Sequence, residues 1–245
     1  MGLLADSPPS LAEAVGRYKN TAAAVIEAYD LLDVPPAHQV SPRLLDAALR
    51  ERMDAMQHLE ADATAGDART AARLVDEAIH LLMDLSAWAQ RLGLDDIEPR
   101  FDELMLALAD WAVSRGGEVH MIGPLADALA KRANREHDLA ALERLTRLGT
   151  RIIRSTAPRA RGASGPPHPD SPWRLLHLNC GIVATRTRNP ALMEHVFEEL
   201  VRNLPTEAPR FFAEGMQQLE RLDFPLAARA VMARYFDRWT RPRMN

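Results

Sequence analysis

The chain has 245 residues, of which 47% are hydrophobic and 26% are charged, a balance that excludes a wholly disordered polypeptide. Its single cysteine, Cys180, excludes an internal disulfide framework and a zinc site with several cysteine ligands. No run of about 18 apolar residues occurs, so we expect no membrane span. Residues 1–10 lack the basic and apolar regions of a secretory signal, so we expect a cytoplasmic protein.

The formal net charge of −4 is distributed unevenly along the chain. Residues 1–117 hold 20 acidic and 10 basic side chains, whereas residues 118–245 hold 14 acidic and 20 basic ones. Opposite charge on the two halves permits head-to-tail association into a homo-oligomer. Differently solvated faces of one molecule would produce the same pattern, so the charge alone does not separate the two explanations.

Apolar residues recur at three- and four-residue spacing along most of the chain, which predicts amphipathic helices. Helix starts are indicated by Ser41–Pro42, Ser171–Pro172 and Asn189–Pro190, and helix ends by Gly93 and by Gly116. Ten helices are predicted, at about residues 10–33, from 42 to the break at Gly66, and at 68–92, 98–114, 119–134, 138–153, 173–187, 191–204, 207–222 and 226–240. No period-2 alternation appears, so no sheet is predicted.

The predicted fold class is all-α, with about ten helices in antiparallel hairpins stacked as a short solenoid or superhelical array. The helix at 68–92 is apolar on two sides, so we expect it to be central. Four segments are distinguished and are expected to form one continuous helical domain. They are an acidic helical bundle at 1–117, a helical hairpin at 118–154, a flexible Pro/Gly-rich loop at 155–171 and two tandem hairpins at 172–245.

The segment Trp173–Trp239 repeats with an offset of 34 residues, as stacked helix pairs do. Gly181 recurs as Gly215, and six apolar pairs keep the offset: Leu178/Phe212, Ile182/Met216, Leu192/Leu226, Val196/Ala230, Phe197/Val231 and Val201/Tyr235. The segment resembles tetratricopeptide repeats, which have a 34-residue unit and a small residue midway along the first helix. The second helix of that family carries a small and then a larger apolar residue, matched by Ala227 and Val231 and less well by Met193 and Phe197, and Pro205 matches its final proline.

The resemblance implies a concave surface that is lined by the first helix of each pair and binds a peptide or protein partner. We therefore predict a non-enzymatic helical-repeat protein, without a cofactor, that acts as an interaction module or scaffold. The candidate groove residues are Asn179, Thr185, Arg186, Arg188, Phe212, Met216 and Glu220. The alternative for these positions is that Phe212 and Met216 belong to the core and that the arginines are ordinary surface residues.

A metal site is the alternative function. Glu77 and His80 are spaced as Glu-x-x-His, which places a carboxylate and an imidazole on one helix face, as in helical-bundle di-iron sites. Asp84 follows one turn later. No second Glu-x-x-His occurs, and Arg73 precedes Glu77 on the same stripe, so a solvated face with spaced ion pairs explains the pattern equally.

Two further patterns point to chemistry less strongly. His177 and Cys180 are spaced as a thiol–imidazole pair would be, but Cys180 shares an apolar stripe with Trp173 and is expected to be buried. The run 144–161 is the most basic in the chain, yet it contains no aromatic residue for base stacking. Nucleic acid is therefore not the expected partner.

Overall fold

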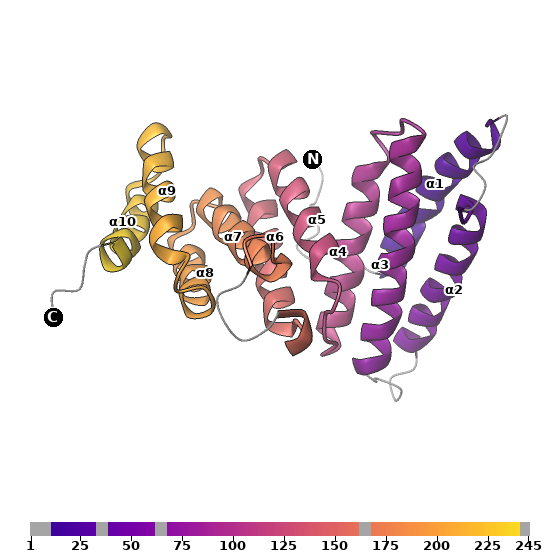
Figure 1. Cartoon of the computed structure of the whole chain (residues 1–245), viewed down its shortest axis with the longest axis horizontal. Helices are drawn as coiled ribbons and strands as arrows, with labels where there is room; N and C mark the ends of the chain where they lie inside the picture. The colour runs from indigo at the N-terminus through magenta and orange to yellow at the C-terminus, as the bar shows by residue number, and fades with distance from the viewer. Residues whose placement is uncertain (1–10, 33–38, 62–67, 162–167, 241–245) are drawn as a thin grey trace. The chain divides into compact units, whose positions relative to one another are not determined.

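The computed structural model describes residues 11–32, 39–61, 68–161 and 168–240. Across these ranges the chain is all-α, as predicted, with ten α-helices, one short 3₁₀ helix and no β-strand (Figure 1). None of the helices in the described ranges combines the length and the apolar character that a membrane span needs. The helices are α1 (Leu11–Asp30), α2 (Pro42–Ala61), α3 (Ala68–Arg91), α4 (Glu98–Ser114), α5 (Ile122–Arg135), α6 (Leu139–Ser155), α7 (Pro172–Arg186), α8 (Pro190–Asn203), α9 (Ala208–Arg221) and α10 (Leu226–Thr240).

The chain divides into two compact units. Unit 1 comprises Met1–Arg132 with Arg154–Ala160, and unit 2 comprises Ala133–Ile153 with Arg161–Asn245. The division passes through α5 and through α6, inside the segment 118–154, and again between residues 160 and 161, inside the Pro/Gly-rich segment 155–171.

Several helix ends are determined by the residues that the sequence indicates. Gly93 and Gly116 have positive φ angles of 69° and 76°, which glycine adopts without a steric cost. After α3, the N–H of Gly93 bonds to the carbonyl of Gln90 and that of Leu94 to the carbonyl of Ala89, which satisfies the last carbonyls of the helix. Gly116 ends the described α4 in the same way, so both predicted helix ends are confirmed.

The start of α5 differs from the prediction. The helix begins at Ile122, three residues later than expected, because Val119 forms an isolated parallel bridge with Thr156. The N–H of Val119 donates to the Ser155 carbonyl at 2.8 Å, and the N–H of Ala157 donates to the Val119 carbonyl at 2.9 Å. Residues 155–161, which the sequence analysis assigns to a flexible loop, are therefore paired and then form the 3₁₀ helix at Pro158–Arg161. Residues 162–167 of that segment lie outside the described residues.

Within unit 1, α1 to α4 form a bundle. Each helix packs against the next, and α1 packs against α4 as well as against α3. α3 contacts α1, α2 and α4 and buries residues on two sides, including Leu74, Ile79 and Leu82. The expectation that residues 68–92 form a central helix is thus confirmed.

One polar chain joins α1 to α2 inside this bundle. The buried Tyr18 hydroxyl donates to Oδ1 of Asp46 at 2.8 Å. Oδ2 of the same carboxylate accepts from Nε of Arg50 at 2.8 Å. Because both oxygens of the buried carboxylate are hydrogen-bonded, Asp46 does not carry the cost of an unsatisfied buried charge.

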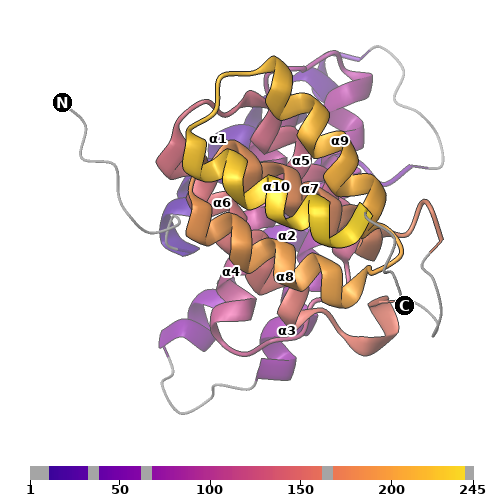
Figure 2. The same cartoon turned by 90° about the vertical axis from the view of Figure 1, so that its left-hand side faces the viewer.

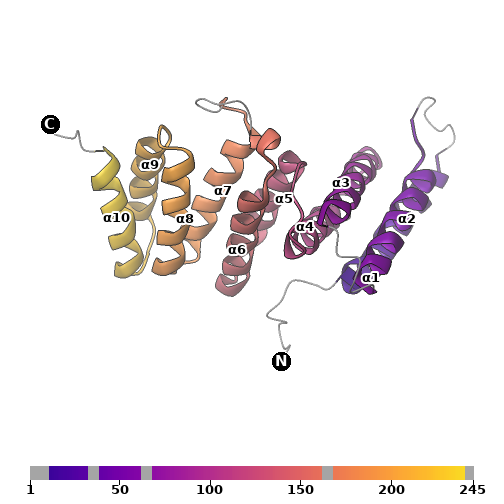
Figure 3. The same cartoon turned by 90° about the horizontal axis from the view of Figure 1, so that it is seen from below.

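Within unit 2, α7 packs against α8, α9 against α10, and α8 against α10. Figures 2 and 3 show α8, α9 and α10 side by side. The core between them is rich in aromatic residues. The ring of Phe197 on α8 lies 5.1 Å from that of Phe212 on α9 and 5.2 Å from that of Tyr235 on α10.

The six apolar pairs of the repeat do not all have the same burial in the two copies. Phe197/Val231 and Val201/Tyr235 are buried in both copies. Leu192 is 6% exposed, whereas its equivalent Leu226 is 86% exposed. The first copy thus buries a surface that the second copy leaves open among the described residues.

The two glycines of the repeat both stand where helices approach closely. A Cβ added to Gly181 would lie 2.6 Å from the ring of Phe211 and 3.1 Å from the side chain of Leu200. A Cβ added to Gly215 would lie 2.8 Å from the side chain of Met232. A methionine side chain can move aside, whereas a phenylalanine ring held between helices cannot do so easily.

We therefore expect opposite effects from alanine at these two positions. Gly181→Ala should lower the free energy of unfolding by about 1–2 kcal/mol, because overpacking costs more than the roughly 1 kcal/mol that alanine gains in a helix. Gly215→Ala should leave the free energy of unfolding unchanged or raise it by up to about 1 kcal/mol. Urea denaturation of both variants followed by circular dichroism measures the difference, and the reverse order of stability would contradict this packing.

Candidate functional site

Three of the seven predicted groove residues are committed to the fold of unit 2. Phe212 is fully buried in the aromatic core and offers no surface to a partner. Thr185 is 8% exposed, and its hydroxyl donates to the Gly181 carbonyl at 2.9 Å within α7. We therefore remove Phe212 and Thr185 from the candidate surface. Arg186 is also removed, because its guanidinium is bound to backbone carbonyls.

Arg186 connects the end of α7 to the end of α5. Its guanidinium donates to the carbonyl of Ala133 at 2.7 Å and to the carbonyl of Glu136 at 2.8 Å. The Ala133 carbonyl lies in the last turn of α5 and also accepts from the N–H of Glu136 at 3.0 Å, and the Glu136 carbonyl directly follows the helix. A cation is also favoured there by the helix dipole. Arg186 is therefore a structural residue that caps another helix.

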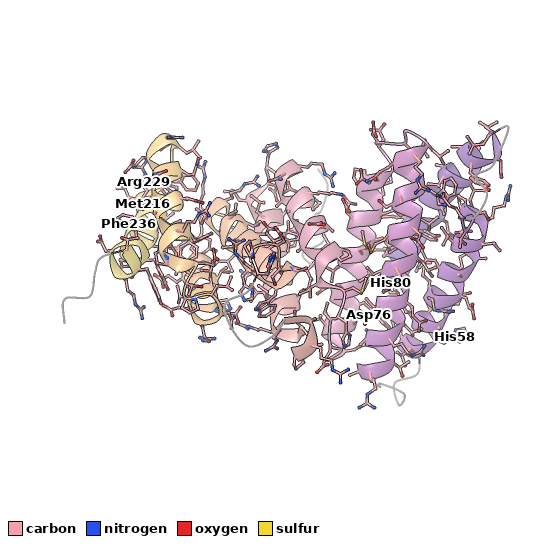
Figure 4. The ribbon with its side chains drawn as sticks, in the orientation of Figure 1. His58, Asp76, His80, Met216, Arg229 and Phe236 are labelled. Carbon is pink, nitrogen blue, oxygen red and sulfur yellow. The ribbon has the colours of Figure 1, made fainter. Side chains whose placement is uncertain are left out.

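The other four candidates lie at the surface of unit 2. Met216 on α9 is half-buried and packs against the core, and Glu220 is exposed one turn later. Asn179 on α7 is half-buried. Arg188 is exposed in the turn after α7, with a φ of 58° and its guanidinium 5.2 Å from the centre of the Phe224 ring. Figure 4 labels Met216 on α9, with Phe236 and Arg229 of α10.

An apolar stripe on α7 was not predicted from the sequence. Leu175 is 36% exposed and Ile182 is 51% exposed, and Leu178 between them is partly buried. The spacing of three and four residues places these side chains on one face of the helix. Ile182 recurs as Met216 at the 34-residue offset, and its exposure places it on the surface. We call Leu175, Leu178, Asn179, Ile182, Met216 and Glu220 the α7–α9 face.

The residues of the metal alternative do not form a ligand set. Glu77 accepts from Nε of Arg52 at 2.6 Å and from Arg73 at 2.8 Å. Burial alone would raise the pKa of Glu77, but the hydrogen bonds from Arg52 and Arg73 outweigh it and lower the pKa. The carboxylate is thus neutralised by two guanidinium groups that leave little room for a cation.

His80 and Asp84 are exposed on α3. Nδ1 of His80 is hydrogen-bonded to the carbonyl of Asp76 at 2.9 Å. Figure 4 shows His58 on α2 well apart from His80 and Asp76 on α3. Within the described residues, no three side chains of His, Cys, Asp or Glu come together as metal ligands.

A pair that the sequence did not indicate joins the segment before α5 to α3. Nδ1 of His120 lies 2.8 Å from a carboxylate oxygen of Asp76. Burial raises the pKa of the Asp76 carboxyl, and the nearby His120 only partly opposes that effect. The two residues are 44 positions apart, so no local spacing could have revealed the pair.

His177 and Cys180 are both buried and do not form a catalytic pair. Nδ1 of His177 is hydrogen-bonded to the Trp173 carbonyl at 2.9 Å, and its Nε2 lies 2.9 Å from the side-chain nitrogen of Asn203. This network assigns the neutral tautomer with the proton on Nδ1. Complete burial raises the pKa of the Cys180 thiol, which keeps it protonated and unreactive.

A second polar surface lies between α8 and α10, around a cavity of about 590 Å³. Glu194 pairs with Arg234, and Glu198 accepts from the Tyr235 hydroxyl at 2.7 Å and from Arg238 at 3.4 Å. Each carboxylate is therefore balanced by an arginine. This surface has no excess charge that would select an ionic ligand.

Comparison with protein-family models, with curated proteins and with solved structures found no match for this chain. Its functional assignment therefore depends on the residues themselves.

The different roles of Arg186 and Arg188 can be tested by the same substitution. Arg186→Met should lower the free energy of unfolding by about 2–3 kcal/mol, because two backbone carbonyls lose a charged donor. Arg188→Met should cost less than about 1 kcal/mol, because it removes only an exposed cation–π contact. Thermal and urea denaturation of the two variants measures this difference. Equal stability of both variants would remove the capping role of Arg186.

The buried His177 predicts a pH dependence for unit 2. Burial lowers the pKa of His177 below its ordinary value, although the hydrogen bond to Trp173 partly opposes this effect. The unfolded chain therefore binds this proton more readily than the folded one. Stability should fall by up to about 1.4 kcal/mol for each pH unit as the pH drops below about 6.5, until the lowered pKa is reached.

Urea denaturation at several pH values on both sides of the ordinary histidine pKa measures this slope. His177→Gln should reduce the slope. A slope that is the same in the wild type and in His177→Gln would show that another group is responsible.

Proposed function

We propose that unit 2 is a tetratricopeptide-like helical-repeat module, stacked as two helical hairpins, and that the protein is a non-enzymatic adaptor. In this proposal a peptide segment of a protein partner binds to the α7–α9 face. The observation that carries the proposal is the apolar stripe on α7. Leu175 and Ile182 are exposed there, and Met216 takes the position equivalent to Ile182 on α9.

Single exposed apolar residues are common on protein surfaces and need no explanation. A row of them on one helix, continued at the equivalent position of the next copy, is typical of a binding surface. Burying one side chain of the size of isoleucine contributes about 1.5–3 kcal/mol, so two or three such contacts support a specific complex.

The repeat geometry gives independent support. Gly181 and Gly215 lie midway along α7 and α9. At each glycine, a neighbouring side chain lies so close that a Cβ would clash with it. Gly181 admits Phe211 of α9 and Leu200 of α8, whereas Gly215 admits Met232 of α10. A small residue midway along each first helix thus lets neighbouring helices approach, as a helical repeat requires, although the approaching side chains differ.

The charge of this face indicates the chemistry of the partner. Glu220 is exposed, and its carboxylate has no ion pair or hydrogen bond among the described residues. It lies one turn beyond Met216 on α9. We therefore expect a partner segment that places apolar side chains on the stripe and a lysine or arginine near Glu220.

Selection of a displayed random-peptide library on the full chain tests this proposal. The selected peptides should be rich in apolar residues next to a basic residue. When they are synthesised and titrated, Ile182→Glu and Met216→Glu should each weaken binding by about tenfold or more, which corresponds to about 1.4 kcal/mol. Glu220→Lys should weaken peptides with a basic residue more than variants of those peptides that lack it.

Leu226→Glu is the matched control, because Leu226 is 86% exposed on α10 and lies outside the α7–α9 face. It should bind the selected peptides as the wild type does. Equal affinity of the wild type and Ile182→Glu would contradict the proposal, as would an equal loss in Leu226→Glu.

A further inference from the structure

Unit 1 contains a cavity of about 300 Å³ between α1 and α4. Its floor is apolar and consists of Ala14 and Tyr18 from α1 and of Phe101 and Leu104 from α4, which are at most 5% exposed. The volume lies at the lower end of the range of small-molecule sites, which is about 300–1,000 Å³.

The rim of this cavity is polar. Arg17 and Asn20 of α1 and Arg100 of α4 are exposed there. Among the described residues, the side chains of all three lack hydrogen bonds and ion pairs. Glu103 is the acidic residue of the rim, and its Oε1 lies 3.7 Å from Nε of Arg132.

Other arginines in the described part of unit 1 differ from Arg17 and Arg100 because they form ion pairs. Arg52 pairs with Glu77, Arg50 with Asp46 and Arg43 with Asp30. Arg73 also pairs with a carboxylate, that of Glu77. At the cavity, by contrast, two guanidinium groups on two different helices border an apolar floor, and α1 adds the side-chain amide of Asn20.

We propose that the α1–α4 cavity binds a small amphipathic carboxylate, whose apolar body fills the floor and whose head group meets Arg17 and Arg100. Guanidinium groups bind carboxylates through charge-assisted hydrogen bonds, and two of them next to an apolar surface select an anion over a neutral molecule. The side-chain amide of Asn20 supplies one further hydrogen-bond donor. The site is separate from the α7–α9 face, so it does not depend on the proposed peptide binding.

Calorimetric titration of the full chain with decanoate, and with decan-1-ol as the neutral analogue of the same length, tests the proposal. Decanoate should bind with a stoichiometry of one, and decan-1-ol should bind about tenfold more weakly or not measurably. The double variant Arg17→Gln/Arg100→Gln should lose the preference for decanoate. Lys19→Gln is the matched control, since Lys19 is an exposed cation of α1 that does not line the cavity.

Ala107→Leu provides a second test that keeps every charge, because Ala107 lines the cavity and a larger side chain would fill it. This variant should lose affinity for decanoate and for decan-1-ol alike. Circular dichroism and thermal unfolding show that each variant is folded. Equal binding of the two ligands, unchanged binding in both cavity variants, or an equal loss in Lys19→Gln would each overturn the proposal.

Discussion

The aromatic ring of Phe197 holds unit 2 together. It projects from α8 and makes edge-to-face contacts with Phe211 and Phe212 of α9 and with Tyr235 of α10, at centroid distances of 5.1–5.8 Å. Each such pair contributes about 0.5–1.5 kcal/mol beyond the burial of its surface. One side chain therefore determines how three helices lie against each other. The position of Phe211 in turn leaves no space for a side chain at residue 181.

This constraint determines which side of α7 faces the core. The inner side of α7 must accept Phe211, so its small residue faces α9. Its core contacts are made by Trp173, Leu176, Cys180 and Val183, which are all buried. Leu175 and Ile182 lie on the remaining side and are not needed for this packing. These two side chains are the ones on which the proposed peptide binding depends.

The sequence predicted the helices well, because their ends depend on local chemistry. Proline at the first turn of α2, α7 and α8, and glycine after α3 and α4, act through their own backbone and need no distant partner. Asn189 caps α8 by accepting from the N–H of Leu192, as its position suggests. By contrast, Val119 delays the start of α5 because it pairs with a residue that is 37 positions away.

The candidate sites were less predictable for the same reason. The spacing of apolar residues does not show which of them a neighbouring helix covers, so the sequence placed the buried Phe212 in the candidate groove and left the exposed Ile182 out of it. Arg186 bonds to backbone carbonyls, which leave no trace in the pattern of side chains. Arg17 and Arg100 have no ion pair among the described residues, and this depends on which carboxylates the folded helices place near them. Each of these features is a property of the assembled helices.

The two copies of the repeat are unequal at one surface. Leu192 is buried, whereas Leu226 at the equivalent position is exposed to solvent. Val196 is likewise buried, and its equivalent Ala230 is exposed. Leu226 and Ala230 thus leave an apolar strip of α10 open that the equivalent residues of α8 bury. In the proposed repeat arrangement, a duplicate of residues 172–205 attached at this surface is expected to cover them. Modular growth of this kind depends only on nearest neighbours, so the added hairpin would leave the aromatic core around Phe197 untouched.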